Sequence, residues 1–196
     1  DTSYTGSHNL TFSGASSSTS PVTAPTVTNN AATAIPFGSA TAITFANGVA
    51  SVGGSMKLYK AETATIAVTD GTISAAGADR LGVVVGAAAA SKLDVSAVPG
   101  GNVTAGASFS VTFVSEDAYG NTSNVVAGTS VTLNASGTGT ISGNTGTITA
   151  GTSSQTLPNV QYTKAESLTL VAHRTSGDVL ADSGSSSAIT VVAGSS

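Results

Sequence analysis

The sequence has no cysteine and no tryptophan, and only 8% of its 196 residues carry a charge. Without cysteine, disulfide bonds and thiolate metal sites are excluded, so each folded domain must be stabilised by its packed core. The six Lys and Arg residues are scattered and the net charge is −4, which argues against nucleic acids and anionic membranes as partners. The longest apolar stretch, residues 83–90, is much shorter than the ~20 residues of a membrane-spanning helix.

Small polar residues are abundant where charges are scarce. The chain contains 30 Ser, 30 Thr and 23 Gly residues, so its surface must be hydrated mainly by hydroxyl and amide groups. This composition, without cysteine, is typical of secreted bacterial or archaeal proteins. We therefore expect a prokaryotic protein that is extracellular or lies at the cell surface.

An internal repeat organises the chain. The segment Lys60-Ala61-Glu62-Thr63-Ala64-Thr65-Ile66 recurs as Lys164-Ala165-Glu166-Ser167-Leu168-Thr169-Leu170, a shift of 164 − 60 = 104 residues. Repeats of about 100 residues are typical of tandem β-sandwich modules, in which each copy adds length without new chemistry. The repeat predicts a first module over residues 1–86, a linker at residues 87–91 and a second module over residues 92–196.

Apolar residues alternate with polar ones, as in half-buried β-strands. Phe109, Val111 and Phe113 follow this pattern, and no apolar period typical of a helix persists for long. In the repeated block, the same alternation predicts a common core face in both copies, formed by Ile66, Val68, Leu168 and Leu170. The sequence therefore predicts an all-β chain of two tandem antiparallel β-sandwiches.

The two copies differ in length before the shared block. Gly6 matches Gly128 at a shift of 128 − 6 = 122, so the first copy holds 122 − 104 = 18 more residues. We assign this insertion to residues 16–33, a Ser/Thr/Pro/Asn tract, and expect a solvated loop there, with a functional loop as the alternative.

The first copy also lacks a counterpart of residues 93–121, which carry the first strands of the second copy. An uncovered core would be costly, because several hundred Å² of exposed apolar surface amounts to several kcal/mol. We expect strands of another polypeptide, or residues that precede this chain, to complete the first module. Head-to-tail assembly into a fibre would follow.

The run Val111-Thr112-Phe113-Val114-Ser115-Glu116-Asp117-Ala118-Tyr119-Gly120-Asn121, followed by Gly128-Thr129-Ser130-Val131-Thr132-Leu133, resembles the bacterial Ig-like repeats of invasin and intimin type adhesins. Similar modules occur in S-layer and other large surface proteins. The resemblance implies tandem Ig-like domains that are extracellular and non-enzymatic. It also implies that they serve as spacers that present a terminal binding domain, with other copies of the chain or neighbouring Ig-like modules of a longer chain as partners.

Glu116, Asp117 and Asn121 are the candidate ligands of a metal ion. Ca²⁺ prefers oxygen ligands but needs about six to eight of them, and three side chains leave the site incomplete. The alternative is a structural turn in which Asp117 and Asn121 accept or donate hydrogen bonds and Gly120 adopts a positive φ. We expect the turn and no cofactor, and Ca²⁺ remains the alternative.

Catalytic machinery is not indicated. His8 and His173 are the only histidines, and neither has a ligand or a catalytic partner at a recognisable spacing. We therefore expect a structural, non-catalytic protein that forms a stalk, filament or lattice. The alternative is a glycan- or ligand-binding module of a secreted enzyme or adhesin, with aromatic platforms drawn from Tyr4, Tyr59, Tyr119 and Tyr162.

Overall fold

The computed structural model describes residues 2–194 and consists of β-strands with one short 3-10 turn, Gly77–Asp79. The prediction of an all-β chain is thus confirmed. The chain divides into two compact units. Unit 1 comprises residues 1–87 and 119–121, and unit 2 comprises residues 88–118 and 122–196.

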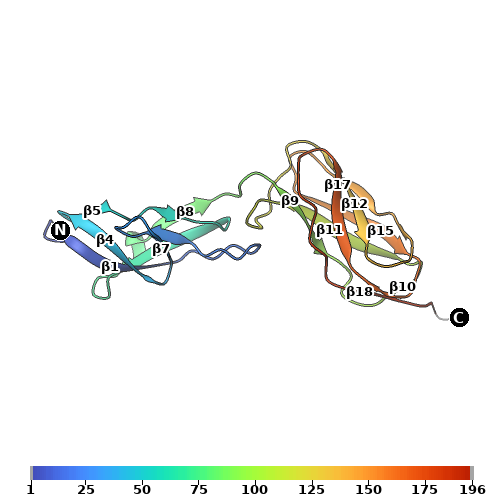
Figure 1. Ribbon diagram of the computed structural model, residues 1–196, viewed down its shortest axis with the longest axis horizontal. Coiled ribbons are helices and arrows are strands. Elements are labelled where there is room, and N and C mark those ends of the chain that lie inside the picture. Colours follow the sequence, from blue (N-terminus) through green and yellow to red (C-terminus); the bar gives the residue numbers. More distant parts are fainter. Residues whose placement is uncertain (1, 195–196) are drawn as a thin grey trace. The chain divides into compact units, whose positions relative to one another are not determined.

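Unit 1 is built on a five-stranded antiparallel sheet in the order β5-β4-β1-β7-β8 (Figure 1). These strands are β1 (Gly6–Ser13), β4 (Ala40–Ala46), β5 (Val49–Val52), β7 (Glu62–Thr69) and β8 (Leu81–Val85). A second sheet has the order β3-β2-β6, formed by β2 (Thr26–Thr28), β3 (Ala34–Pro36) and β6 (Met56–Lys57). The two edges of the larger sheet are therefore β5 and β8.

One apolar core joins the two sheets of unit 1. Its buried residues come from β1, β2, β4 and β7, and they are Leu10, Phe12, Val27, Ile43, Ala64 and Ile66. On β1 and β7 the buried side chains recur at every second residue, because successive side chains of a strand point to opposite faces. Burial on this one face fixes the register of the sheet.

The inserted segment 16–33 is part of this core. Val27 is fully buried, and it pairs with Met56 of the second sheet. In unit 2 the corresponding pair is Phe109 with Val160, since 160 − 56 = 104. β2 thus occupies the place of the first residues of strand β11 (Ser108–Glu116). The expectation of a solvated loop is wrong for residues 26–28, and the chain itself fills part of the predicted gap.

Unit 2 contains a four-stranded sheet in the order β13-β15-β11-β9 and a three-stranded sheet in the order β14-β12-β17. A third, mixed group has the order β10-β18-β16. The remaining strands are β9 (Lys92–Ala97), β10 (Val103–Thr104), β12 (Thr129–Ala135), β13 (Ile141–Ser142), β14 (Thr145–Ile148), β15 (Ser154–Tyr162), β16 (Ser167–Leu168), β17 (Leu170–Ser176) and β18 (Ile189–Val192).

The core of unit 2 draws on all three groups of strands. Its buried residues are Leu93, Val103, Phe109, Val111, Phe113, Val125, Val131, Leu133, Ile148, Leu157, Val160, Tyr162, Leu168, Leu170, Ala172, Leu180, Ile189 and Val191. Part of the difference from the smaller core of unit 1 comes from β11, which spans nine residues, whereas β2, which takes its place, spans three.

Candidate functional site

The repeated Lys-Ala-Glu segment makes the same contacts in both units. In unit 1 the backbone N–H of Ser16 donates to Glu62 Oε1 at 2.6 Å. In unit 2 the backbone N–H of Thr138 donates to Glu166 Oε1 at 2.7 Å. The donors are 138 − 16 = 122 residues apart and the acceptors 166 − 62 = 104, which are the two shifts found in the sequence. The internal repeat is therefore present in the structure as a shared hydrogen bond.

A lysine two residues earlier accompanies each of these glutamates. The Nζ–Oε2 distance is 3.9 Å for Lys60 and Glu62 and 3.2 Å for Lys164 and Glu166. Both ion pairs are partly exposed, so each contributes little by itself. The carboxylate acts mainly by holding a distant loop in place. In unit 1 this loop follows β1 and its donor lies 46 residues before the glutamate, and in unit 2 the loop follows β12 and its donor lies 28 residues before the glutamate.

Unit 2 carries the more elaborate version of this contact. The hydroxyl of Tyr162 donates to Glu166, and the backbone N–H of Gly139 donates both to Tyr162 Oη at 2.6 Å and to Glu166 Oε1 at 3.0 Å. The Tyr162 hydroxyl is the main cause that lowers the pKa of Glu166 to about 2. A side chain at Gly139 would collide with the Tyr162 ring and with Lys164, so this turn requires glycine.

The four predicted core residues lie on β7 in unit 1 and on β16 and β17 in unit 2. Ile66 is buried and Val68 is partly buried in unit 1, while Leu168 and Leu170 are buried in unit 2. In register, Phe12 pairs with Val68 and Leu133 pairs with Ala172, where 172 − 68 = 104. By these pairings β1 corresponds to β12 at a shift of 133 − 12 = 121 residues. The sequence match of Gly6 with Gly128 gives a shift of 122, which is one residue more.

The three candidate calcium ligands face different partners. Glu116 lies 3.6 Å from Lys92 Nζ, and burial, followed by the nearby Asp94, raises the pKa of Glu116. Asp117 is buried, and its Oδ2 accepts the backbone N–H of Ala88 at 3.0 Å. Within residues 2–194, no group of three or more His, Asp or Glu side chains is arranged to hold a metal ion.

Asn121 and Gly120 serve unit 1, to which residues 119–121 belong. The Asn121 amide accepts the backbone N–H of Ala61 at 2.7 Å and donates to the Tyr59 carbonyl at 2.8 Å. It thereby fixes the chain just before Glu62. Gly120 has φ +80°, and a Cβ there would lie 2.8 Å from Thr19 Oγ1. These residues hold a turn through specific backbone contacts.

The two histidines lie in separate units and in different surroundings. His8 stacks on Tyr4 with ring centroids 3.9 Å apart, and its Nε2 lies 2.9 Å from the Thr5 carbonyl oxygen. His173 Nδ1 lies 2.6 Å from Asp182 Oδ2, and this contact is the main cause that lowers the pKa of Asp182. Both side chains of this second pair are about half exposed.

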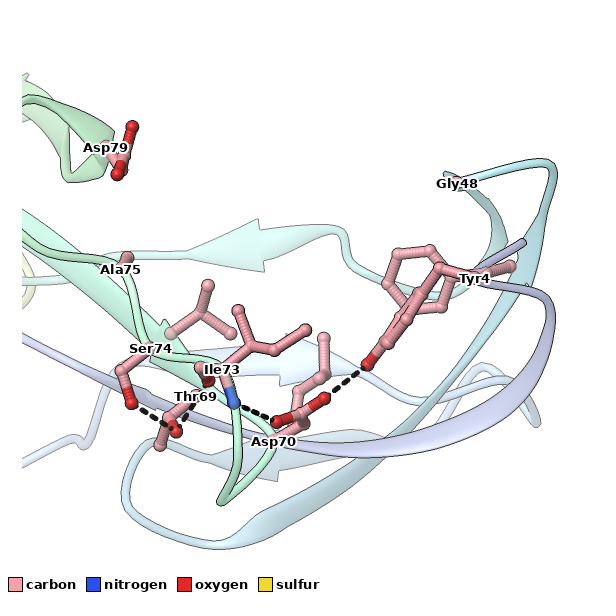
Figure 2. Close-up of a pocket in the computed structure, with 11 residues that line it drawn as sticks. Tyr4, Gly48, Thr69, Asp70, Ile73, Ser74, Ala75 and Asp79 are labelled. Carbon is pink, nitrogen blue, oxygen red and sulfur yellow. Dashed lines mark hydrogen bonds between the residues drawn. The ribbon is translucent and has the colours of Figure 1, made fainter. Parts of the chain in front are cut away.

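A cavity of about 390 Å³ opens on unit 1 (Figure 2). Leu10, Phe45, Val68 and Ile73 give it an apolar lining, and Tyr4 closes one side. Figure 2 shows Asp70 between two donors, the Tyr4 hydroxyl at 2.9 Å and the Ile73 backbone N–H at 2.7 Å. The backbone N–H groups of Ile73 and Thr72, then the Tyr4 hydroxyl, lower the pKa of Asp70. Sequence reasoning missed this cavity, because its residues come from distant segments.

Within the described residues, strands β11 and β9 of unit 2 have unequal counterparts in unit 1. β2 takes part of the place of β11. In unit 2, β9 bonds to Ala181 through the Leu93 N–H at 2.9 Å. The Ala75 N–H donates to the Val68 carbonyl in unit 1, as the Ser183 N–H donates to the Ala172 carbonyl in unit 2. Ala75 and Ser183 are therefore equivalent, and two residues before them Ile73 is the counterpart of Ala181. Ile73 instead bonds within the Asp70 turn.

No strand among residues 2–87 takes the place of β10. β10 pairs with β18 in unit 2, whereas β8 of unit 1 has a strand neighbour only on its β7 side within residues 2–194. The opposite edge of the same sheet, β5, likewise has its only strand neighbour in β4 across that described range. Within the described residues, β5 and β8 are therefore the edge strands of the larger sheet of unit 1.

The chain matches no protein-family model and no curated protein. It is similar to solved structures of the S-layer protein SbsC. Domains 4 and 5 of that protein are 16% identical over 95% of this chain and 99% of theirs, with a TM-score of 0.33. The structure of rSbsC(31-844) is 18% identical over 95% of this chain and 28% of its own length, with a TM-score of 0.35. Within residues 2–194, no helix is both long and apolar enough to span a membrane.

Proposed function

We propose that this chain is a structural, non-catalytic part of an extracellular protein at a prokaryotic cell surface. Its two units act as tandem Ig-like modules of a longer stalk, filament or lattice. Modules in series add length and repeat the same surface at a fixed spacing, without new chemistry in each copy. The proposal makes shape and connectivity, rather than a reaction, the property that the chain supplies.

The observation that carries this proposal is the repeated glutamate contact. Glu62 and Glu166 bond the equivalent backbone N–H groups of Ser16 and Thr138 in the two units. A catalytic carboxylate would be needed once, in one site. A carboxylate that does the same structural work in both units fits a chain selected for repeated, stable modules.

Head-to-tail assembly by strand addition is the second part of the proposal. Open edges on β5 and β8 support it, because an unpaired edge presents backbone N–H and C=O groups to any strand of suitable polarity. Contacts between unlike surfaces do not close on themselves and run on as filaments or sheets.

Immunogold electron microscopy of intact source cells tests the proposed function. Antibodies against this chain should label the outside of unbroken cells in a regular layer or along filaments. Label that appears only after the cells are permeabilised would contradict it. This result does not depend on how purified copies of the chain associate.

The second candidate function, glycan or ligand binding, is favoured by the cavity of unit 1. Tyr4, His8 and Phe45 form an aromatic cluster beside it, with the Tyr4 and Phe45 rings 4.9 Å apart edge to face. Aromatic rings beside a carboxylate such as Asp70 can bind sugar rings. A glycan array should give hits that Tyr4→Ala abolishes if this function holds, and an array without hits would count against it.

A further inference from the structure

We propose that the backbone of residues 163–165 in unit 2 is a docking site for an asparagine side chain of a further module in the same polypeptide. This inference rests on the proposed function and names the backbone groups through which unit 2 holds its neighbour. Unit 1 displays the same site with an asparagine bound to it, and unit 2 repeats the site with its backbone groups exposed.

The site in unit 1 is a bend of the chain at Lys60. Asn121, which belongs to unit 1, accepts the Ala61 N–H at 2.7 Å and donates to the Tyr59 carbonyl at 2.8 Å. The bend thus offers one donor and one acceptor, and the amide of a single asparagine matches both. An aspartate would instead place a second acceptor against the Tyr59 carbonyl.

The chain on both sides of this bend is equivalent in the two units. Before the bend, the pairing of β2 with β6 matches that of β11 with β15 at a shift of 160 − 56 = 104. After the bend, Glu62 and Glu166 accept equivalent backbone N–H groups at the same shift, 166 − 62 = 104. The chain bends at the lysine in both units. Residues 163–165 therefore present their backbone groups as residues 59–61 do.

The equivalent groups of unit 2 are exposed. Thr163 donates its N–H to the Thr140 carbonyl at 3.1 Å, and its hydroxyl accepts the Thr140 N–H at 2.9 Å. Within residues 2–194, no group donates to the Thr163 carbonyl, and the Ala165 N–H has no acceptor. Ala165 is exposed, whereas its equivalent Ala61 is half-buried. Unit 2 thus offers the same donor and acceptor to an incoming side chain.

Unit 1 identifies the side chain that fits. Asn121 lies 60 residues after Ala61 in one polypeptide, and the Asn121 of another copy is already bonded within its own unit 1. The occupant in unit 2 is therefore the equivalent asparagine of a further module in the same polypeptide. The Tyr59 and Tyr119 rings, 4.8 Å apart, have no counterpart because Thr163 stands in place of Tyr59. Only the asparagine contact carries over.

A chain extended by a second copy of residues 91–194 tests this contact. Val85 and Val191 are equivalent, because each lies two residues after the partner of an equivalent core residue. Asn121 lies 121 − 85 = 36 residues after Val85. Attached directly after residue 196, the added copy carries its asparagine 36 residues after Val191. The extended chain therefore reproduces the spacing that unit 1 has.

Hydrogen exchange followed by NMR, with the isotope label confined to residues 1–196, compares the original chain with the extended one. Exchange at Ala165 should slow about tenfold on extension, as expected for one added hydrogen bond. Alanine in place of the added asparagine should restore the fast exchange. Asn121→Ala at the original position is the matched control, and it should speed exchange at Ala61 but leave Ala165 protected. Circular dichroism verifies that each chain is folded.

Three results would overturn the inference. Equal exchange at Ala165 in the original and extended chains, with Ala61 protected in both, excludes the contact. Protection of Ala165 that persists when the added asparagine is alanine assigns it to another group. Fast exchange at Ala61 in the original chain removes the template on which the inference is built. None of these results bears on the labelling of intact cells, so the proposed surface function stands or falls separately.

Discussion

Replacing Val27 by alanine tests whether the inserted segment is structural. Val27 is fully buried between the two sheets of unit 1, although it lies in a tract of Ser, Thr and Pro. The substitution removes two methyl groups, worth about 0.8 kcal/mol each by transfer, and leaves a cavity that adds to the cost. We expect a loss of about 2–3 kcal/mol in the stability of unit 1.

A loss of this size is easily measured. For a domain of this length each kcal/mol corresponds to about 4–8 °C, so the melting temperature of unit 1 should fall by about 8–24 °C. Differential scanning calorimetry should show this shift in one transition while the transition of unit 2 is unchanged. Hydrogen exchange assigns the shifted transition, because amides of β2, β3 and β6 should exchange faster.

Val22→Ala is the matched control for this substitution. Val22 belongs to the same inserted segment but is 78% exposed, so its truncation should change stability by less than about 0.5 kcal/mol. Equal melting temperatures for the Val27→Ala and Val22→Ala chains would refute the structural role of β2. The segment would then be the solvated loop that its composition indicates.

Three further predictions concern metal, pH and backbone conformation. Chelation with EDTA should leave both melting transitions in place, because Glu116, Asp117 and Asn121 face separate partners, and a fall reversed by Ca²⁺ would contradict this. The pKa of Glu166 is lowered from 4.5 to about 2, so its contribution to unit 2 is present above pH 4.5 and is lost as the pH falls through about 2. Glu166→Gln should flatten the melting temperature of unit 2 over that range, and an unchanged slope would exclude the assignment. Gly120→Ala should destabilise unit 1 by about 1–3 kcal/mol in urea titrations, because φ is +80° and the new Cβ would crowd Thr19. Gly100→Ala, with open space and no positive φ, is its control and should be close to neutral.

Features that depend on local pattern could be predicted from the sequence. The strand at Phe109, Val111 and Phe113 follows from alternation alone, because every second side chain along it points to the same face and is buried there. The Lys-Ala-Glu repeat likewise located equivalent positions in both units, although the partners of its glutamates lie 46 and 28 residues away and could not be identified from it. These patterns therefore predict where strands occur, which of their side chains face the core and which positions of the two units are equivalent.

Features that depend on distant partners could not be predicted in this way. Thr26-Val27-Thr28 is too short to be recognised as a strand, and Val27 is buried because β2 pairs with β6 and Val27 joins the core of unit 1. Asp117 and Asn121 are close in sequence, but their orientations are decided by Ala88 and Ala61, which lie 29 and 60 residues away.

The scarcity of charge has a consequence for salt tolerance. Ion pairs join Lys60 to Glu62, Lys92 to Glu116 and Lys164 to Glu166, and most other polar contacts of the described residues join hydroxyl, amide and backbone groups. Screening shortens the reach of charges from about 10 Å at 0.1 M salt to about 3 Å at 1 M, but it has little effect on hydrogen bonds between neutral groups. The two units should therefore melt at nearly the same temperatures in dilute buffer and in concentrated sodium chloride. A surface structure built from them would keep its form through large changes in salinity.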